Sequence, residues 1–181
     1  MRRSLLAVLA AVAGATALAA SDAGVRVTPV VSDGRVLATF AAPSAWTPDA
    51  RELVRGGLAL TFLFDVELRR PSTLFFDATL ARTRVTSEAR YDTLTKSFRV
   101  SKTRDGRLVE STRSEQEPEV REWMTGFQQV LLEPAEPLEP NAEYYVRVRL
   151  YVRPRRTVSL WSLWPFGRDD ASGRATFTYI R

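Results

Sequence analysis

The stretch LALTFLFDVEL, residues 58–68, decides the fold. Its apolar side chains recur at every second position, namely Leu58, Leu60, Phe62, Phe64, Val66 and Leu68. The alternate positions include Thr61, Asp65 and Glu67. A period of two over eleven residues predicts a long strand with one buried face and one polar face. Pro71-Ser72 is predicted to end this strand.

Arginines alternate along the next segment, residues 78–91, where Arg82 and Arg84 lie on the polar face. Residues directly opposite on neighbouring strands interact across a sheet. We therefore expect Asp65 and Glu67 to pair with these arginines. Such pairing lowers the pKa of both carboxyls, whereas a general acid requires a raised pKa.

Further strands are predicted on both sides of this pair. Segments 25–31 and 35–40 flank Asp33-Gly34, and segments near 98–100 and 108–111 flank Asp105-Gly106. Asp-Gly between apolar alternations is typical of a tight hairpin. Residues 144–152 predict a strand whose apolar side chains alternate with arginine and tyrosine, and residues 175–179 predict a closing strand that runs to the C-terminus.

Two short helices are also predicted. Thr47-Pro48-Asp49 has a capping residue, a proline and an acid at a helix start, and Gly56-Gly57 would end that helix. Ser114 and Glu117 have the spacing of a capping box at the start of a second helix. Its apolar positions recur at helical spacing, and we interpret them as core packing: Val120, Trp123, Met124 and Phe127.

The pattern as a whole predicts a mainly β fold. Strands joined mostly by hairpins favour an antiparallel β-sandwich, or a strongly curled sheet, with two short helices. Residues 20–181 are expected to form a single β-rich domain. The connection from Pro154 to Ser172 spans nineteen residues, whereas most loops have about 4–6, and such length indicates a function or hidden structure.

The first residues have the pattern of an export signal. Arg2-Arg3 precedes an apolar run over residues 5–18, and Ala17-Leu18-Ala19 is a cleavage pattern. We predict a signal peptide at residues 1–19 that is cut before Ala20, which makes the protein periplasmic or envelope-associated in a bacterium. A retained membrane anchor is the alternative, but fourteen apolar residues fall short of the roughly 20 that span a bilayer.

Composition excludes several chemistries. The 181 residues include no His and no Cys, which removes imidazole bases, thiol nucleophiles and the usual zinc, haem and iron–sulfur ligands. The 26 basic and 21 acidic residues give a net charge of +5, and removal of residues 1–19 with two arginines leaves +3. That excess is too small to indicate nucleic acid as a partner. We predict no cofactor, no metal site and no catalytic residue.

Four stretches carry a resemblance to a known family. They are GGLALTFLFDVELRR at 56–70, RYDTLTKSFRV at 90–100, NAEYYVRVRLYV at 141–152 and LWSLWPF at 160–166. In order and spacing they resemble a bacterial exported family, domain of unknown function 4390. The resemblance implies an export signal followed by one domain in the bacterial envelope. It brings no known activity and no catalytic residues.

One basic and aromatic segment is the candidate binding surface. Its residues are Arg147, Arg149, Arg153, Arg155, Arg156, Trp161, Trp164 and Phe166. Amphipathic aromatics beside basic residues suit a membrane interface or a docking surface. Two other interpretations remain open. The arginines could form a solvated strand face, and the aromatic residues could fold as a plug over one end of the sheet.

Three functions are compatible with these patterns. The first is a non-enzymatic module that binds an envelope protein or another envelope component. The second is a module whose Arg/Trp surface contacts anionic lipid or polysaccharide at the membrane periphery. The third is a carboxylate-dependent envelope hydrolase that uses Asp65 and Glu67, or Asp169 and Asp170. Asp169 and Asp170, however, are more simply interpreted as part of a turn.

Overall fold

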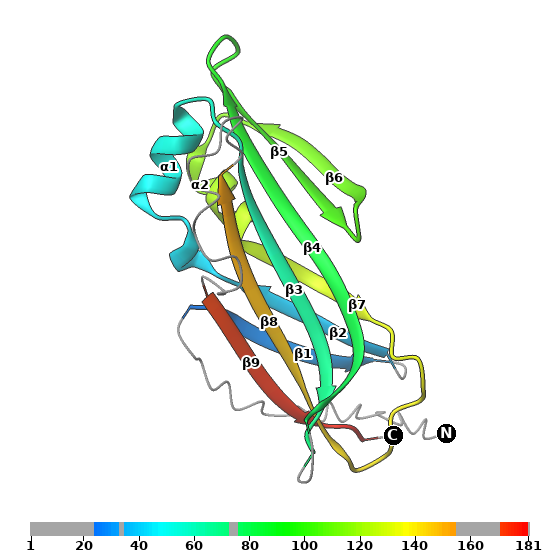
Figure 1. The fold of residues 1–181 in the computed structure, drawn as a ribbon. Coiled ribbons are helices and arrows are strands. Elements are labelled where there is room, and N and C mark those ends of the chain that lie inside the picture. The colour runs from blue at the N-terminus through cyan, green and yellow to red at the C-terminus, as the bar shows by residue number, and fades with distance from the viewer. Residues whose placement is uncertain (1–23, 33–34, 73–75, 155–170, 181) are drawn as a thin grey trace, which may run out of the picture.

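The computed structural model describes residues 24–32, 35–72, 76–154 and 171–180. Within these ranges the chain forms nine strands, two α-helices and one short 3-10 helix, η1 (Pro43–Ala45). All the strands pair antiparallel in two sheets, one of six strands and one of three (Figure 1). The predicted mainly β fold with two short helices is confirmed.

The large sheet has the order β6-β5-β4-β3-β8-β9, so β3 lies near its centre. Its strands are β3 (Leu60–Arg70), β4 (Ala78–Asp92), β5 (Ser97–Arg104), β6 (Arg107–Ser114), β8 (Glu143–Pro154) and β9 (Ala171–Thr178). The small sheet has the order β1-β2-β7, with β1 (Arg26–Ser32), β2 (Arg35–Ala41) and β7 (Gly126–Leu132). In Figure 1 the small sheet crosses behind β8, β3 and β4.

The core lies between the two sheets. The apolar face of β3 is buried as the alternation predicts, and its Phe62, Phe64 and Val66 have no exposed surface. The ring of Phe64 lies 5.2 Å from Phe40 of β2 and 5.3 Å from Phe127 of β7, measured between centroids. The two sheets are therefore held together by aromatic packing on β3.

The first helix forms where its capping signals predict. In α1 (Pro48–Arg55) the Thr47 hydroxyl accepts a hydrogen bond from the N–H of Ala50 at 3.1 Å, and Gly56 is the C-cap. The second helix is α2 (Glu117–Thr125). No helix in the described part of the chain has the length and apolar character needed to cross a membrane.

The predicted capping box at the start of α2 is wrong. The N-cap is Gln116, and no side chain caps it. Ser114 instead accepts a hydrogen bond from the N–H of Gln116 and donates one to Glu119 at 2.7 Å. The carboxylate of Glu117 is occupied elsewhere, because it pairs with Arg51 and Arg55 of α1 at 2.9 and 2.6 Å. These ion pairs join the two helices.

The extension of the second helix to Phe127 is also wrong. The helix ends at Thr125, and Phe127 lies in strand β7, which the sequence did not predict. The buried residues of β7 are Phe127, Val130 and Leu132, so their spacing is not that of a regular strand. The pairing with β2 shifts here, and Gln129 has a positive φ of 51°. This bulge hides the two-residue period.

The hairpin at Asp105-Gly106 is confirmed, and both residues have the positive φ values, 47° and 81°, that a tight hairpin turn requires. Asp33-Gly34 lies outside the described residues, but Ser32 pairs with Arg35 on either side of it. The closing strand β9 ends at Thr178 rather than continuing to the C-terminus. Most of the long connection before it, residues 155–170, lies outside the described residues.

The two sheets also meet at one edge, where β1 approaches β9. Gly24 forms a parallel bridge with Ser172, and Val25 is almost fully buried. A Cβ atom placed on Gly173 would lie 2.0 Å from the carbonyl oxygen of Val25. Only glycine fits at this position without a shift of the backbone.

We expect Gly173→Ala to lower the free energy of unfolding by about 1–3 kcal/mol, because the added methyl group forces β1 and β9 apart. Urea denaturation followed by tryptophan fluorescence would measure the change. Thr176→Ala, on the same strand and half-buried, is the matched control and should stay within about 0.5 kcal/mol of the unmodified protein. If Gly173→Ala and Thr176→Ala had equal free energies of unfolding, this would contradict the close approach of the chain at Gly173 and Val25.

Candidate binding surface on the large sheet

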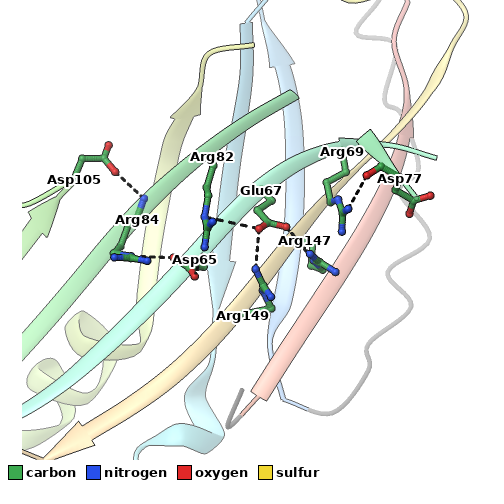
Figure 2. A network of polar contacts seen from close by, with 9 residues as sticks. All are labelled: Asp65, Glu67, Arg69, Asp77, Arg82, Arg84, Asp105, Arg147 and Arg149. Atoms are coloured by element: carbon green, nitrogen blue, oxygen red, sulfur yellow. Dashed lines mark hydrogen bonds and ion pairs between the residues drawn. The ribbon is translucent and has the colours of Figure 1, made fainter. Parts of the chain in front are cut away.

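Two carboxylates are buried on the outer face of the large sheet. Asp65 and Glu67 point away from the core on β3, yet each has only 4% of its surface exposed. A buried charge is costly unless it is paired and hydrogen-bonded. The flanking strands β4 and β8 supply the partners, as Figure 2 shows.

Asp65 is held by two arginines of β4. Arg82 donates to its Oδ2 atom at 2.8 Å, and Nε of Arg84 donates to its Oδ1 atom at 3.1 Å. In the sheet, Asp65 lies directly opposite Arg84. The cross-strand pairing that the sequence predicts for this acid is confirmed.

Glu67 is held mainly from the other side, by β8. Arg147 donates two hydrogen bonds to its Oε2 atom, at 2.6 and 3.2 Å, and Arg149 donates one to Oε1 at 2.8 Å. Arg82 adds a longer ion pair to the same carboxylate at 3.8 Å. The two acids and four arginines therefore form one network across β4, β3 and β8 (Figure 2).

The arginines keep both acids ionised. Burial alone would raise the pKa of Asp65, but the hydrogen bonds and charges of Arg84 and Arg82 outweigh it and hold the pKa below its usual value. Burial likewise opposes ionisation of Glu67, and Arg147 and Arg149 lower its pKa in the same way. Neither carboxyl has the raised pKa that a general acid requires.

A second group of polar contacts on the same face is centred on Asp77, just before β4. Its carboxylate accepts a hydrogen bond from the Tyr145 hydroxyl at 2.5 Å, and its carbonyl oxygen accepts one from Arg69 at 2.7 Å. The guanidinium of Arg174 lies over the Tyr145 ring, 4.2 Å from its centroid. Arg69 of β3 and Arg174 of β9 thus lie close to Asp77 on the same face, and the charge of Arg69 also contributes to the lowered pKa of Glu67.

Arginines outnumber acids on the outer face of the described large sheet. By register and alternation, the described strands place ten arginines there against five carboxylates, Asp65, Glu67, Glu88, Asp92 and Glu143. We call these arginines the arginine face: Arg69, Arg82, Arg84, Arg90, Arg99, Arg113, Arg147, Arg149, Arg153 and Arg174. Asp77, just before β4, also lies on this face beside Arg69 and Arg174, and with it counted the ten arginines exceed the six acids by four, so this face is net positive.

Three of the residues predicted from the sequence belong to this face. Arg147 and Arg149 are occupied by Glu67, whereas Arg153 is exposed and lies opposite Thr61. The other predicted residues lie outside the described part of the chain: Arg155, Arg156, Trp161, Trp164 and Phe166. The same holds for Asp169 and Asp170 and for residues 1–19.

Sequence reasoning missed the arginines that other strands contribute, such as Arg99 and Arg113. Arg99 lies between the buried Phe98 and Val100, so the alternation of β5 could have identified it as an outward residue, whereas β6 has no buried residue and its pattern gives no such signal for Arg113. The register that places them opposite one another is set by hairpin geometry and a bulge between Lys102 and Thr103. Side-chain alternation alone does not reveal that register.

A groove beside the second helix was not predicted from the sequence either. An open groove of about 1470 Å³ runs beside α2 and is lined by residues of both sheets and the helix. Within it, Lys102 donates to the Gly126 carbonyl at 3.0 Å and lies 4.3 Å from the Trp123 ring centroid. Burial lowers the pKa of Lys102. These contacts engage the ammonium group in joining β5 to α2 and β7.

Fold and surface together define a β-sandwich domain with a basic sheet face. A family model described as Domain of unknown function (DUF4390) matches residues 24–158, and the chain belongs to this family. The resemblance stated from the sequence is confirmed. No curated protein and no solved structure gives a significant match to the chain. The family description assigns no activity, so the function has to be argued from the site.

The buried acids make stability depend on pH. In the unfolded chain Asp65 and Glu67 have ordinary pKa values of 3.8 and 4.5, and in the folded chain both values are lower. Their contribution is therefore fully present above about pH 5 and is lost as the pH falls through the folded-state values. We expect the free energy of unfolding to decrease over this acidic range, as measured by urea denaturation at a series of pH values.

Glu67→Gln tests the assignment of this pH dependence. The variant should be less stable at pH 7 and should show a shallower loss of stability at acidic pH, because the titrating group is gone. The control is Glu136→Gln, which replaces an exposed carboxyl in the 133–142 connection. Its free energy of unfolding should change with pH as it does in the unmodified protein. If Glu67→Gln loses stability at acidic pH as steeply as the control, the buried carboxyls are not the source of the pH dependence.

Proposed function

We propose that the chain is an exported bacterial envelope protein that binds an anionic envelope component, without catalysing a reaction, through the arginine face. Export is supported by the pattern of residues 1–19. Binding is supported by the concentration of ten arginines on one face of the large sheet.

The observation that carries this proposal is the use of buried acids to position arginines. Asp65 and Glu67 each engage only part of the guanidinium groups around them, and the side chains of Arg82 and Arg84 remain 51% and 55% exposed. A planar guanidinium with free N–H groups suits phosphate and carboxylate groups, because it donates two hydrogen bonds at once. The network therefore presents several pre-oriented donors to an anionic ligand.

The electrostatics favour binding over hydrolysis. A carboxylate-dependent hydrolase needs one acid with a raised pKa beside one that stays ionised. The pKa values of Asp65 and Glu67 are both lowered, and arginines cover both groups. This pair therefore supports the binding interpretation.

Charge reversal on the arginine face tests the binding proposal. We expect Arg153→Glu with Arg174→Glu to weaken capture of the envelope ligand about tenfold or more, because both side chains are exposed and the local charge changes by four units. Immobilised protein would be incubated with envelope extract, and the retained lipids, glycans and proteins would be quantified at low and moderate salt.

Arg26→Glu with Arg35→Glu is the matched control, since it changes the charge equally on the exposed surface of the small sheet. The control should retain the same material as the unmodified protein. Retention of that material by the Arg153/Arg174 variant at control levels would contradict binding through the arginine face.

Export has its own test. We expect the protein recovered from fractionated bacteria to begin at Ala20 and to lie in the periplasmic or envelope fraction, because Ala17-Leu18-Ala19 precedes the cleavage site. Mass spectrometry of the intact protein would give the first residue, and Ala19→Phe should block processing. A full-length chain in the cytoplasmic fraction would contradict export.

A further inference from the structure

Three arginines of the arginine face form a row without intervening acids. Arg90 of β4 lies directly opposite Arg99 of β5, and Arg99 lies directly opposite Arg113 of β6. All three side chains are exposed. Like charges directly opposite in a sheet are destabilising. At the centre of the sheet, by contrast, Asp65 and Glu67 separate the arginines of β4 from those of β8.

The three arginines of this row make few hydrogen bonds or ion pairs within the described structure. Nε of Arg90 donates to the Gly57 carbonyl at 3.2 Å, whereas the guanidiniums of Arg99 and Arg113 make no hydrogen bond or ion pair to any described residue. Glu88 of β4 lies on the same face, opposite Ser101. The acid at the turn is Asp92, whose charge interacts with Arg99 and Arg113. Its Oδ1 atom accepts hydrogen bonds from backbone N–H groups, and these, more than the arginines, lower its pKa.

An exposed apolar side chain lies at the β4–β5 turn, just beyond the end of the strands that carry this row. The backbone N–H groups that Asp92 binds are those of Leu94 and Thr95, at 3.0 and 3.2 Å, so the acid fixes the β4–β5 turn. Leu94 is 93% exposed at the tip of that turn, and Lys96 adds another cation. The turn forms the end of the molecule opposite the C-terminus (Figure 1).

We propose that this end of the domain docks on the phosphate headgroups of an anionic phospholipid bilayer. Arg90, Arg99 and Arg113 bind the phosphates, and Leu94 enters the interface beside them. The inference rests on the proposed function, since it names the anionic component that the arginine face binds. Cations next to an exposed apolar side chain are the combination that an anionic membrane surface attracts.

The shape of the row favours a bilayer over a soluble anion. The three guanidiniums come from adjacent strands about 4.8 Å apart, so they lie side by side on an open sheet. A single soluble phosphate is best held in a concave site where donors converge. A layer of headgroups, however, offers a separate phosphate to each side chain.

Vesicle co-sedimentation of the purified exported chain tests this inference. We expect binding to mixed phosphatidylglycerol–phosphatidylcholine vesicles, no binding to pure phosphatidylcholine, and weaker binding as salt increases. Because each cation near an anionic surface strengthens binding roughly fivefold, Arg99→Gln with Arg113→Gln should weaken it about 25-fold. Leu94→Ser should also weaken binding, while Arg26→Gln with Arg35→Gln should not.

A stability measurement separates a docking role from a structural one. Removing like charges that face each other should raise the Tm of the Arg99/Arg113 variant by roughly 1–3 °C at low salt, and high salt should remove this gain. A variant that is more stable but binds vesicles less tightly supports the proposal. A variant that binds vesicles as tightly as the control overturns it.

Two other outcomes would overturn the lipid inference and leave the proposed function standing. One is capture of an envelope component that depends on Arg153 and Arg174, together with no binding to anionic vesicles. The other is stabilisation by inorganic phosphate at constant ionic strength, again without vesicle binding, which would identify a soluble anion as the ligand. Loss of the capture itself would instead count against the proposed function.

Discussion

The two negative charges buried on the outer face of β3 constrain the rest of the large sheet. Asp65 and Glu67 are almost fully covered, so β4 and β8 have to place arginines opposite them. A slip of one residue in either pairing would leave a buried carboxylate without a partner and turn apolar side chains toward solvent. The acids therefore fix the register of the three central strands, in addition to the packing of Phe64 on the small sheet.

Stability alone does not account for this arrangement. Replacing a buried ion pair by apolar side chains of similar size is often neutral or stabilising, so an outer face built from leucine and valine would hold the strands equally well. What the charged version adds is a set of guanidiniums with fixed orientation and free N–H groups, as at Arg82 and Arg84. One strand thereby serves both purposes, since alternate residues of β3 build the core and organise the surface.

The sequence predicted those parts of the structure that depend on local pattern. The strand over residues 58–68, the first helix with its Thr47 cap and the pairing of Asp65 with arginines of the next strand follow from alternation and capping chemistry. Strand β7 did not, because a bulge at Gln129 interrupts its period and a helix runs directly into it. The row of Arg90, Arg99 and Arg113 depends on register between strands, which no single segment encodes.

Charge compensation also differs along the arginine face, and this difference bears on function. At its centre each buried acid is shared by two or three arginines, which fixes the side chains but leaves them partly neutralised. Toward the β4–β5 turn the arginines oppose one another, and Asp92, the acid at that turn, is engaged by the backbone of the turn. Such repulsion lowers the stability of the free protein, and a ligand that neutralises the arginines removes it. Binding of that ligand therefore stabilises the folded protein. The unpaired end, rather than the ion-paired centre, is therefore where an anionic surface gains most by contact.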